Sequence, residues 1–172
     1  MTLPLLLAGV FPALVIVAAA YDATSYTIPN WISAALVLAF FPVALVAGMA
    51  PAQIGLSALV GVAVLIVGVG AFAMGWIGGG DAKLLAASAL WLGWPAVANF
   101  LLVTALAGGA LAVALMSLRA VGFGLLAARG PAWIGRLLEE KGAAPYGLAI
   151  AAGALFAFPA SSLTLATQGL AG

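Results

Sequence analysis

Residues 3–22 read LPLLLAGVFPALVIVAAAYD, an apolar run without any charge until it ends in Asp22. About 20 apolar residues are enough for a helix to cross the hydrocarbon core of a bilayer. The rest of the 172-residue chain has the same character: 67% of its residues are hydrophobic, 5% are charged, and the mean hydropathy is +1.32. Soluble domains are roughly half apolar and one quarter charged. The composition therefore predicts an all-α integral membrane protein.

The first run also resembles a signal peptide, because it contains Ala18-Ala19-Ala20 near its end. Signal peptides, however, begin with a positively charged stretch. No Lys or Arg precedes Lys83. We therefore expect this run to be kept as the first membrane span.

Apolar windows of spanning length predict a polytopic fold of about six transmembrane helices. We expect spans at residues 3–21, 31–49, 53–74, 83–94, 96–118 and 145–167 and a loop at 119–144, in one membrane domain that covers 1–172. The fourth and fifth spans are divided at Gly93-Trp94-Pro95, a sequence that favours a turn. The fourth span is short, so we expect it to be tilted or only partly spanning.

The positions of the charged residues agree with six spans. All of them fall on one side of the membrane, in the loops 22–30, 75–83 and 119–144. Positive residues prefer cytoplasmic loops, so this side is expected to face the cytoplasm, with both termini outside. Asp22 and Asp81 then lie at the same membrane face. The segment that follows Pro131 is predicted to form a short helix in the interface with lipid.

Several classes of function are excluded by composition. The chain has no cysteine and no histidine, which excludes disulfides, thiolate zinc sites and mechanisms that need an imidazole. The net charge of +1 gives no reason to expect nucleic-acid binding. Two isolated aspartates make a poor metal site, and we expect neither a metal nor any other cofactor.

Asp22 and Asp81 are the candidate catalytic residues. A carboxylate at the centre of a membrane helix costs about 2.5–3.5 kcal/mol on insertion, so each aspartate is a functional candidate by default. Two neighbouring carboxyl groups share one proton; the ionised group takes a proton from water, and the protonated group polarises a peptide carbonyl. The helix dipole favours a negative charge at the start of a helix and disfavours a negative charge at its end. On that argument Asp81 is the base and Asp22 the acid.

Residues beside the aspartates are expected to support the site or contact substrate: Gly78, Gly80, Lys83, Ile28, Pro29 and Asn30. Glycine lets an extended substrate approach closely, although glycines also serve helix packing. Lys83 either extends to the interface as a topology signal or lies near substrate. Asn30, which follows Pro29, is expected to cap the second helix.

The segments around both aspartates resemble sequence motifs of a known family. The segment Gly78-Gly79-Gly80-Asp81-Ala82-Lys83-Leu84 matches the Gly-x-Gly-Asp-x-Lys-Leu motif of type IV prepilin peptidases. Asp22, six residues before Ile28-Pro29-Asn30, matches their first catalytic motif. Pro145-Tyr146-Gly147-Leu148-Ala149 is similar to the start of their final helix. The chain resembles the short, peptidase-only members of this family, which are similar to those that serve tight-adherence (Flp) pili.

The resemblance implies an aspartyl endopeptidase that removes the short basic leader from prepilin or pseudopilin precursors. It implies a site at the cytoplasmic face of the bacterial inner membrane, with Asp22 and Asp81 as the catalytic pair. Many family members also methylate the new terminus, using an insertion that often carries Cys-x-x-Cys motifs; this chain has no cysteine and no room for the insertion. One departure is the segment 23–27, Ala-Thr-Ser-Tyr-Thr, which lacks the basic residues often found there.

Other functions stay open. Presenilin-like intramembrane proteases share the Gly-x-Gly-Asp core, and Tyr21-Asp22 is similar to their first motif. A small ion-coupled transporter would bind H⁺ or Na⁺ on one aspartate, near the middle of the bilayer. A non-catalytic assembly component would not need paired carboxylates.

Overall fold

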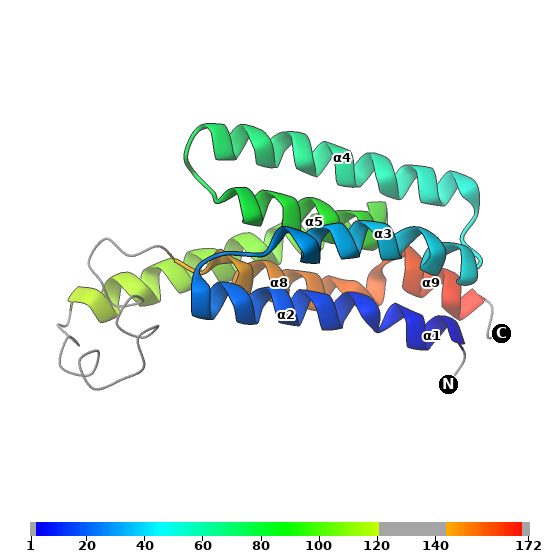
Figure 1. Cartoon of the computed structure of the whole chain (residues 1–172), viewed down its shortest axis with the longest axis horizontal. Coiled ribbons are helices and arrows are strands. Elements are labelled where there is room, and N and C mark those ends of the chain that lie inside the picture. Colours follow the sequence, from blue (N-terminus) through cyan, green and yellow to red (C-terminus); the bar gives the residue numbers. More distant parts are fainter. Residues whose placement is uncertain (1–2, 121–143, 170–172) are drawn as a thin grey trace.

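The computed structural model describes residues 3–120 and 144–169 (Figure 1). Within these residues the chain forms helices and no strand, as the composition predicted. The elements are α1 (Leu3–Ala8), α2 (Val10–Ser25), α3 (Asn30–Val46), α4 (Pro51–Ala73), α5 (Gly79–Ala120), α8 (Tyr146–Ala157), η1 (Phe158–Ala160) and α9 (Ser162–Gly169). The interfacial helix expected after Pro131 lies outside the described residues.

The helix α5 lies at the centre of the bundle and packs against α3, α4 and α8, while α2 packs against α8 (Figure 1). Helices in a bilayer gain little from burying apolar surface, so close packing of small residues holds them together. Two glycines of α4 show this: Gly61 lies against Leu90, and Gly68 lies against Ala82.

The chain reverses inside α5 at Gly93, whose φ of 66° and ψ of −173° are not helical. A side chain at Gly93 would collide with the hydroxyl groups of Ser57 and Ser162. Residues 79–92 run beside α4, and residues 94–120 return beside α8, where Gly108 lies against Tyr146. The reversal coincides with the turn predicted at 93–95. Glycine is suited to this position because it adopts positive φ without steric cost.

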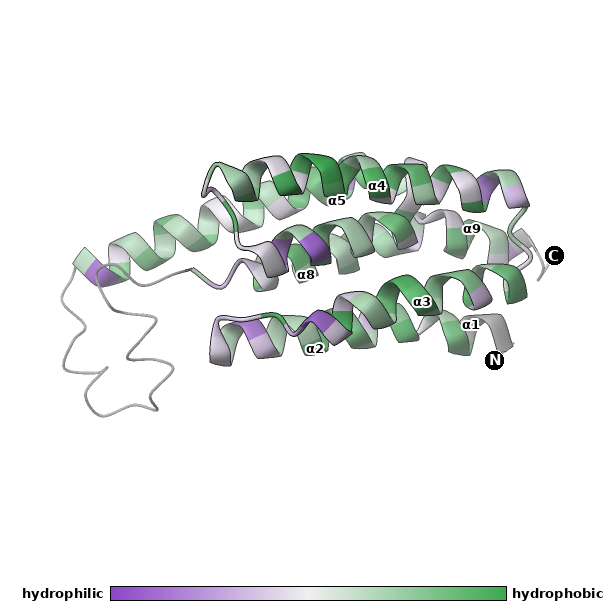
Figure 2. Ribbon diagram, turned by 45° about the horizontal axis from the view of Figure 1, so that its top comes forward, coloured by the Kyte–Doolittle hydropathy of each residue, from purple (hydrophilic) through white to green (hydrophobic). Residues whose placement is uncertain are grey.

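Among residues 3–120 and 144–169, four helical stretches are long and apolar enough to cross a membrane: Leu6–Ser25, Pro51–Ala73, Gly79–Ala120 and Tyr146–Gln168. The stretch Asn30–Val46 is equally apolar but shorter, with 17 residues. Large apolar side chains point away from the bundle, as expected where lipid is the surrounding solvent; Leu38 is 72% exposed and Val67 is 73% exposed. Figure 2 shows that hydrophobic residues predominate along the helices.

The two ends of the bundle differ. Both described chain ends lie together at one end, beside the α3–α4 connection (Figure 1). The α2–α3 and α4–α5 connections and the start of α8 lie at the other end, which we name the aspartate end because Asp22 and Asp81 adjoin it. Hydrophilic segments gather there in Figure 2.

A buried aromatic cluster around Trp91 joins the helices that carry the candidate site. Trp91 is fully buried, and its indole N–H donates a 2.8 Å hydrogen bond to the Leu36 carbonyl of α3. Its ring stacks on Phe11 of α2 at 5.3 Å between centroids and meets Phe40 of α3 edge-on at 5.8 Å. Aromatic pairs in these geometries contribute beyond the area that they bury.

We expect Trp91→Ala to destabilise the protein by about 3–5 kcal/mol, because truncation of a buried aromatic residue leaves a cavity. The matched control is Trp94→Ala, since Trp94 is close in sequence but 68% exposed. Thermal unfolding in detergent micelles measures the difference. Equal melting temperatures for the two variants would show that the cluster does not hold α2, α3 and α5 together.

Candidate active site

Asp22 lies in the last turn of α2, where it is only 5% exposed. Its Oδ2 accepts a 2.6 Å hydrogen bond from the backbone N–H of Gly147, in the first turn of α8. The first N–H groups of a helix have no partner within that helix and carry its positive dipole end. Asp22 therefore caps α8 from a distant part of the chain.

Gly147 provides the space for this contact. A Cβ atom on Gly147 would lie 2.8 Å from both Cβ and Oδ2 of Asp22. Such a distance is too short for any real side chain, so a larger residue at 147 would displace the carboxyl group. The sequence indicated this residue only as part of the segment that begins at Pro145, without a role of its own.

Asp81 lies in the first turn of α5 and is partly buried. Its Oδ2 accepts a 3.1 Å hydrogen bond from the backbone N–H of Gly78, the residue that precedes α5. An acidic residue at the third helical position that bonds back to the N-cap N–H forms half of a capping box. Each aspartate thus receives an N–H at the start of a helix.

The structure brings the two carboxyl groups to the same end of the bundle, Asp22 at the start of α8 and Asp81 at the start of α5. This arrangement changes the argument from helix dipoles. The sequence placed Asp22 only at the unfavourable end of α2, but the favourable start of α8 also faces it. The dipoles therefore do not distinguish which aspartate is the base and which is the acid.

The glycines before Asp81 have two separate structural uses. A Cβ on Gly78 would lie 2.8 Å from Oδ2 of Asp81, so glycine leaves room for the carboxyl group to fold back. A Cβ on Gly80 would lie 3.2 Å from Cβ of Ile28. This contact seats the α2–α3 connection, which contains Ile28 and Pro29, directly on the start of α5.

A side-chain hydrogen bond forms a second contact between the segment that follows Asp22 and the start of α5, in addition to the contact of Gly80 with Ile28. The ammonium group of Lys83 donates to Oδ1 of Asn30 at 2.8 Å. The expectation that Asn30 caps α3 is wrong: the N-cap position is Pro29, and the Asn30 side chain is directed to α5 instead. Proline has no backbone N–H, so Pro29 itself adds no unsatisfied donor before the helix, and its carbonyl accepts the Ile32 N–H at 3.1 Å.

A cavity of about 240 Å³ opens between these motifs, beside the Asp81 carboxyl group. It is lined by residues of the α2–α3 connection and of the glycine run: Tyr26, Thr27, Ile28, Asn30, Gly78, Gly79, Gly80 and Asp81. Tyr26 has a left-handed backbone, with φ of 56°, which is uncommon outside glycine and costs about 1–2 kcal/mol. Strained residues of this kind gather at functional sites, and no pattern in the sequence indicated this one.

We expect Gly147→Ala to destabilise the protein by about 1–3 kcal/mol, because the new methyl group overlaps the Asp22 side chain. Gly109→Ala is the matched control: a Cβ there meets nothing within 4 Å. In that open helical position alanine should stabilise by about 0.5–1 kcal/mol. Thermal unfolding in detergent would measure changes of opposite sign, and a neutral Gly147→Ala would contradict the described contact.

Comparison with known proteins supplies the family. A model of the type IV leader peptidase family matches residues 9–113. The matched segment contains Asp22, the α2–α3 connection, the glycine run and Asp81. No curated protein and no solved structure matches the chain. Since the matched residues make up more than half of the chain, the protein belongs to the type IV leader peptidase family.

Proposed function

We propose that the protein is an intramembrane aspartyl endopeptidase that removes the leader peptide from type IV prepilins, with Asp22 and Asp81 as its catalytic pair. Family membership supports leader peptidase activity in general. The observation that supports the aspartyl mechanism is that two carboxyl groups, each held by the N–H of a helix start, lie at one end of an otherwise apolar bundle. A transporter site near the bilayer middle fits this placement poorly.

In the proposed reaction, one carboxylate removes a proton from a water molecule as the water attacks the scissile carbonyl. The other carboxyl group, still protonated, gives its proton to the carbonyl oxygen. The first carboxyl group then passes the proton taken from water to the leaving amine as the C–N bond breaks, and a hydroxyl of the intermediate returns a proton to the second carboxylate. The Gly147 and Gly78 N–H groups hold the two side chains in position. The Lys83–Asn30 bond and the Gly80–Ile28 contact keep the two motifs together and shape the cavity in which the extended substrate binds.

We also propose that the chain forms one membrane domain with six crossings, since the reversal at Gly93 divides α5 into two. The aspartate end faces the cytoplasm on this proposal, because the sequence places all nine charged residues in or beside the three connections on one side of the six expected spans. The membrane is the bacterial inner membrane. The lack of cysteine and of a long insertion is consistent with a peptidase-only enzyme, similar to those that process Flp-type prepilins.

Asp22→Asn and Asp81→Asn should each reduce cleavage of a co-expressed prepilin at least about 100-fold, because the amide cannot take up or release the proton. The amide oxygen can still accept the N–H bond from Gly147 or Gly78, so both variants should remain folded in the membrane. The shift of the precursor band on a gel measures the cleavage.

The control for both variants is Thr24→Ala. Thr24 is an exposed residue near Asp22, and its hydroxyl bonds only within α2. This variant should cleave normally. Full cleavage by either Asn variant would refute the assignment of Asp22 and Asp81 as the catalytic pair. Loss of cleavage in the control would show that activity is lost on any substitution near the end of α2.

The proposed orientation can be measured with single cysteines, since the chain has none of its own. Ser25→Cys places a thiol in an exposed position at the aspartate end, and Ala52→Cys places one in an exposed position at the opposite end. A membrane-impermeant maleimide should label Ala52→Cys in intact spheroplasts and label Ser25→Cys only after permeabilisation. The reverse pattern would place the catalytic pair outside the cytoplasm.

A further inference from the structure

The residue that ends α2 has an unusual backbone. Among residues 3–120 and 144–169, Tyr26 is the only residue other than glycine with a positive φ, and its φ of 56° and ψ of 25° are left-handed. Its backbone N–H donates a 2.9 Å hydrogen bond to the carbonyl of Asp22. The left-handed turn therefore closes the helix that carries one of the two candidate catalytic residues.

Two other helices end in a left-handed residue, and both use glycine. Gly48 follows α3 with a φ of 72°, and Gly75 follows α4 with a φ of 75°. After α3 the Gly48 N–H bonds to the Leu45 carbonyl and the Met49 N–H bonds to the Ala44 carbonyl, the pair of bonds that defines a Schellman motif. Glycine adopts this backbone without steric cost. The end of α2 differs by placing a large side chain where the other two ends have none.

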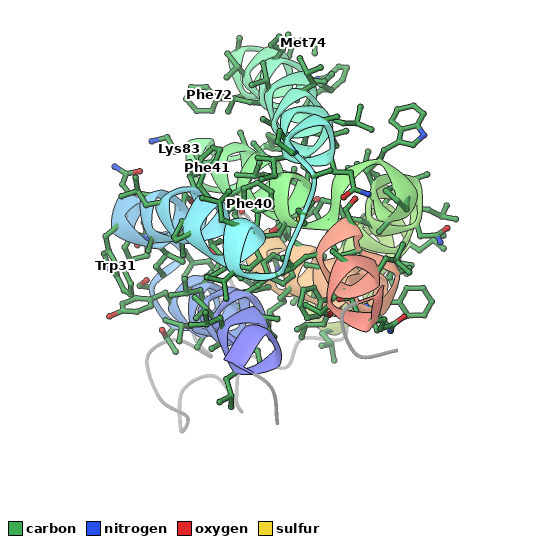
Figure 3. All side chains as sticks on the ribbon, turned by 90° about the vertical axis from the view of Figure 1, so that its right-hand side faces the viewer. Trp31, Phe40, Phe41, Phe72, Met74 and Lys83 are labelled. Atoms are coloured by element: carbon green, nitrogen blue, oxygen red, sulfur yellow. The ribbon has the colours of Figure 1, made fainter. Side chains whose placement is uncertain are left out.

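The comparison with Gly75 separates the backbone from the space around it. A Cβ on Gly75 would meet nothing within 4 Å, so a side chain would fit there. The neighbouring Phe72 and Met74 extend outward from the bundle, at 53% and 55% exposure (Figure 3). Glycine at this position is thus explained by the left-handed backbone alone. At Tyr26 the same backbone is combined with a ring, although the combination costs stability.

Tyr26 lies where a ring has a use, because it lines the cavity beside Asp81. Three of the eight lining residues are glycines, which offer only backbone to a bound molecule. Tyr26 is the largest of the eight, the only aromatic residue among them, and half-buried. An aromatic side chain provides a broad contact surface with little rotamer freedom to lose.

We propose that Tyr26 is a substrate-binding residue of this cavity, whose ring covers the extended peptide beside the scissile bond. The chain tolerates a left-handed tyrosine at the end of α2 because the ring is needed at this place. This inference rests on the proposed function, and it adds a residue to which that function assigned no role.

The two walls of the cavity would divide the binding of the peptide between them. The glycine run 78–80 exposes backbone, which can pair with the backbone of an extended substrate. The ring of Tyr26 would pack on the same peptide by dispersion contacts. Such a contact does not change as the scissile bond reacts, so it stabilises substrate and transition state equally. Loss of the ring should therefore raise KM and leave kcat unchanged.

The test is steady-state cleavage of a synthetic prepilin peptide that spans the leader junction, with purified protein in detergent micelles. Tyr26→Gly should raise KM about tenfold, the effect of losing one decade of affinity, with kcat within about twofold of wild type. Tyr26→Phe keeps the ring and should keep both constants within about twofold. The backbone N–H that bonds to Asp22 is present in every variant, so the comparison isolates the side chain.

Thermal unfolding in the same detergent separates substrate binding from a structural role. Tyr26→Gly suits the left-handed backbone and should unfold at a temperature no lower than wild type. Tyr26→Ala removes the same ring but keeps the unfavourable backbone, so it should unfold below Tyr26→Gly and show the same rise in KM. A Tyr26→Gly variant that unfolds clearly below wild type would show that the ring only holds the α2–α3 connection, and would overturn the inference.

Tyr21→Ala is the matched control. Tyr21 is a tyrosine near the same end of α2, 43% exposed, whose ring lies edge-on to Trp31 and which does not line the cavity. Its KM should equal that of wild type. A rise in KM as large as that of Tyr26→Gly would show that the effect belongs to this end of the helix in general, and would also overturn the inference.

The outcomes distinguish this inference from the proposed function. If wild type cleaves and Tyr26→Gly has an unchanged KM, or loses only kcat, Tyr26 does not bind substrate and the peptidase assignment stands. If wild type cleaves no prepilin, or if Asp22→Asn cleaves fully, the proposed function fails and the role of Tyr26 fails with it.

Discussion

The hydrogen bond from the Gly147 N–H to the Asp22 carboxyl group connects residues that are 125 positions apart in the sequence. It places a carboxyl group in an apolar bundle without leaving it unsatisfied, and it gives the start of α8 a cap that α8 itself lacks. The Asp81 carboxyl group likewise accepts a hydrogen bond from a helix-start N–H, that of Gly78, which lies only three residues away in the sequence. Because each carboxyl group needs a helix start beside it, the positions of α5 and α8 fix the geometry of the pair.

Glycine determines how closely the elements of the site approach one another. Gly147 admits the Asp22 side chain, Gly78 admits the Asp81 side chain, and Gly80 admits Ile28. Farther away, Gly93 allows the chain to reverse within α5 and thereby brings Trp91 against α2 and α3. In a bilayer such contacts matter more than in water, since packing rather than apolar burial drives association.

The bundle is asymmetric with respect to lipid. The helix α4 is held mainly by α5, and a hollow of about 580 Å³ lies between α3 and α4. Asn30 and Lys83, joined by a hydrogen bond, line this hollow.

The sequence by itself determined the all-helical fold, the turn at 93–95 and the two aspartates at one end, because hydropathy and charge in a bilayer tolerate few alternatives. It also pointed to the family through the two motifs. Tertiary structure alone decided that Gly147 binds Asp22, that Asn30 pairs with Lys83 instead of capping α3, and that Tyr26 is strained. These features depend on contacts between distant segments. Local propensity and periodicity describe only neighbouring residues, so they could not reveal which helix start would face which side chain.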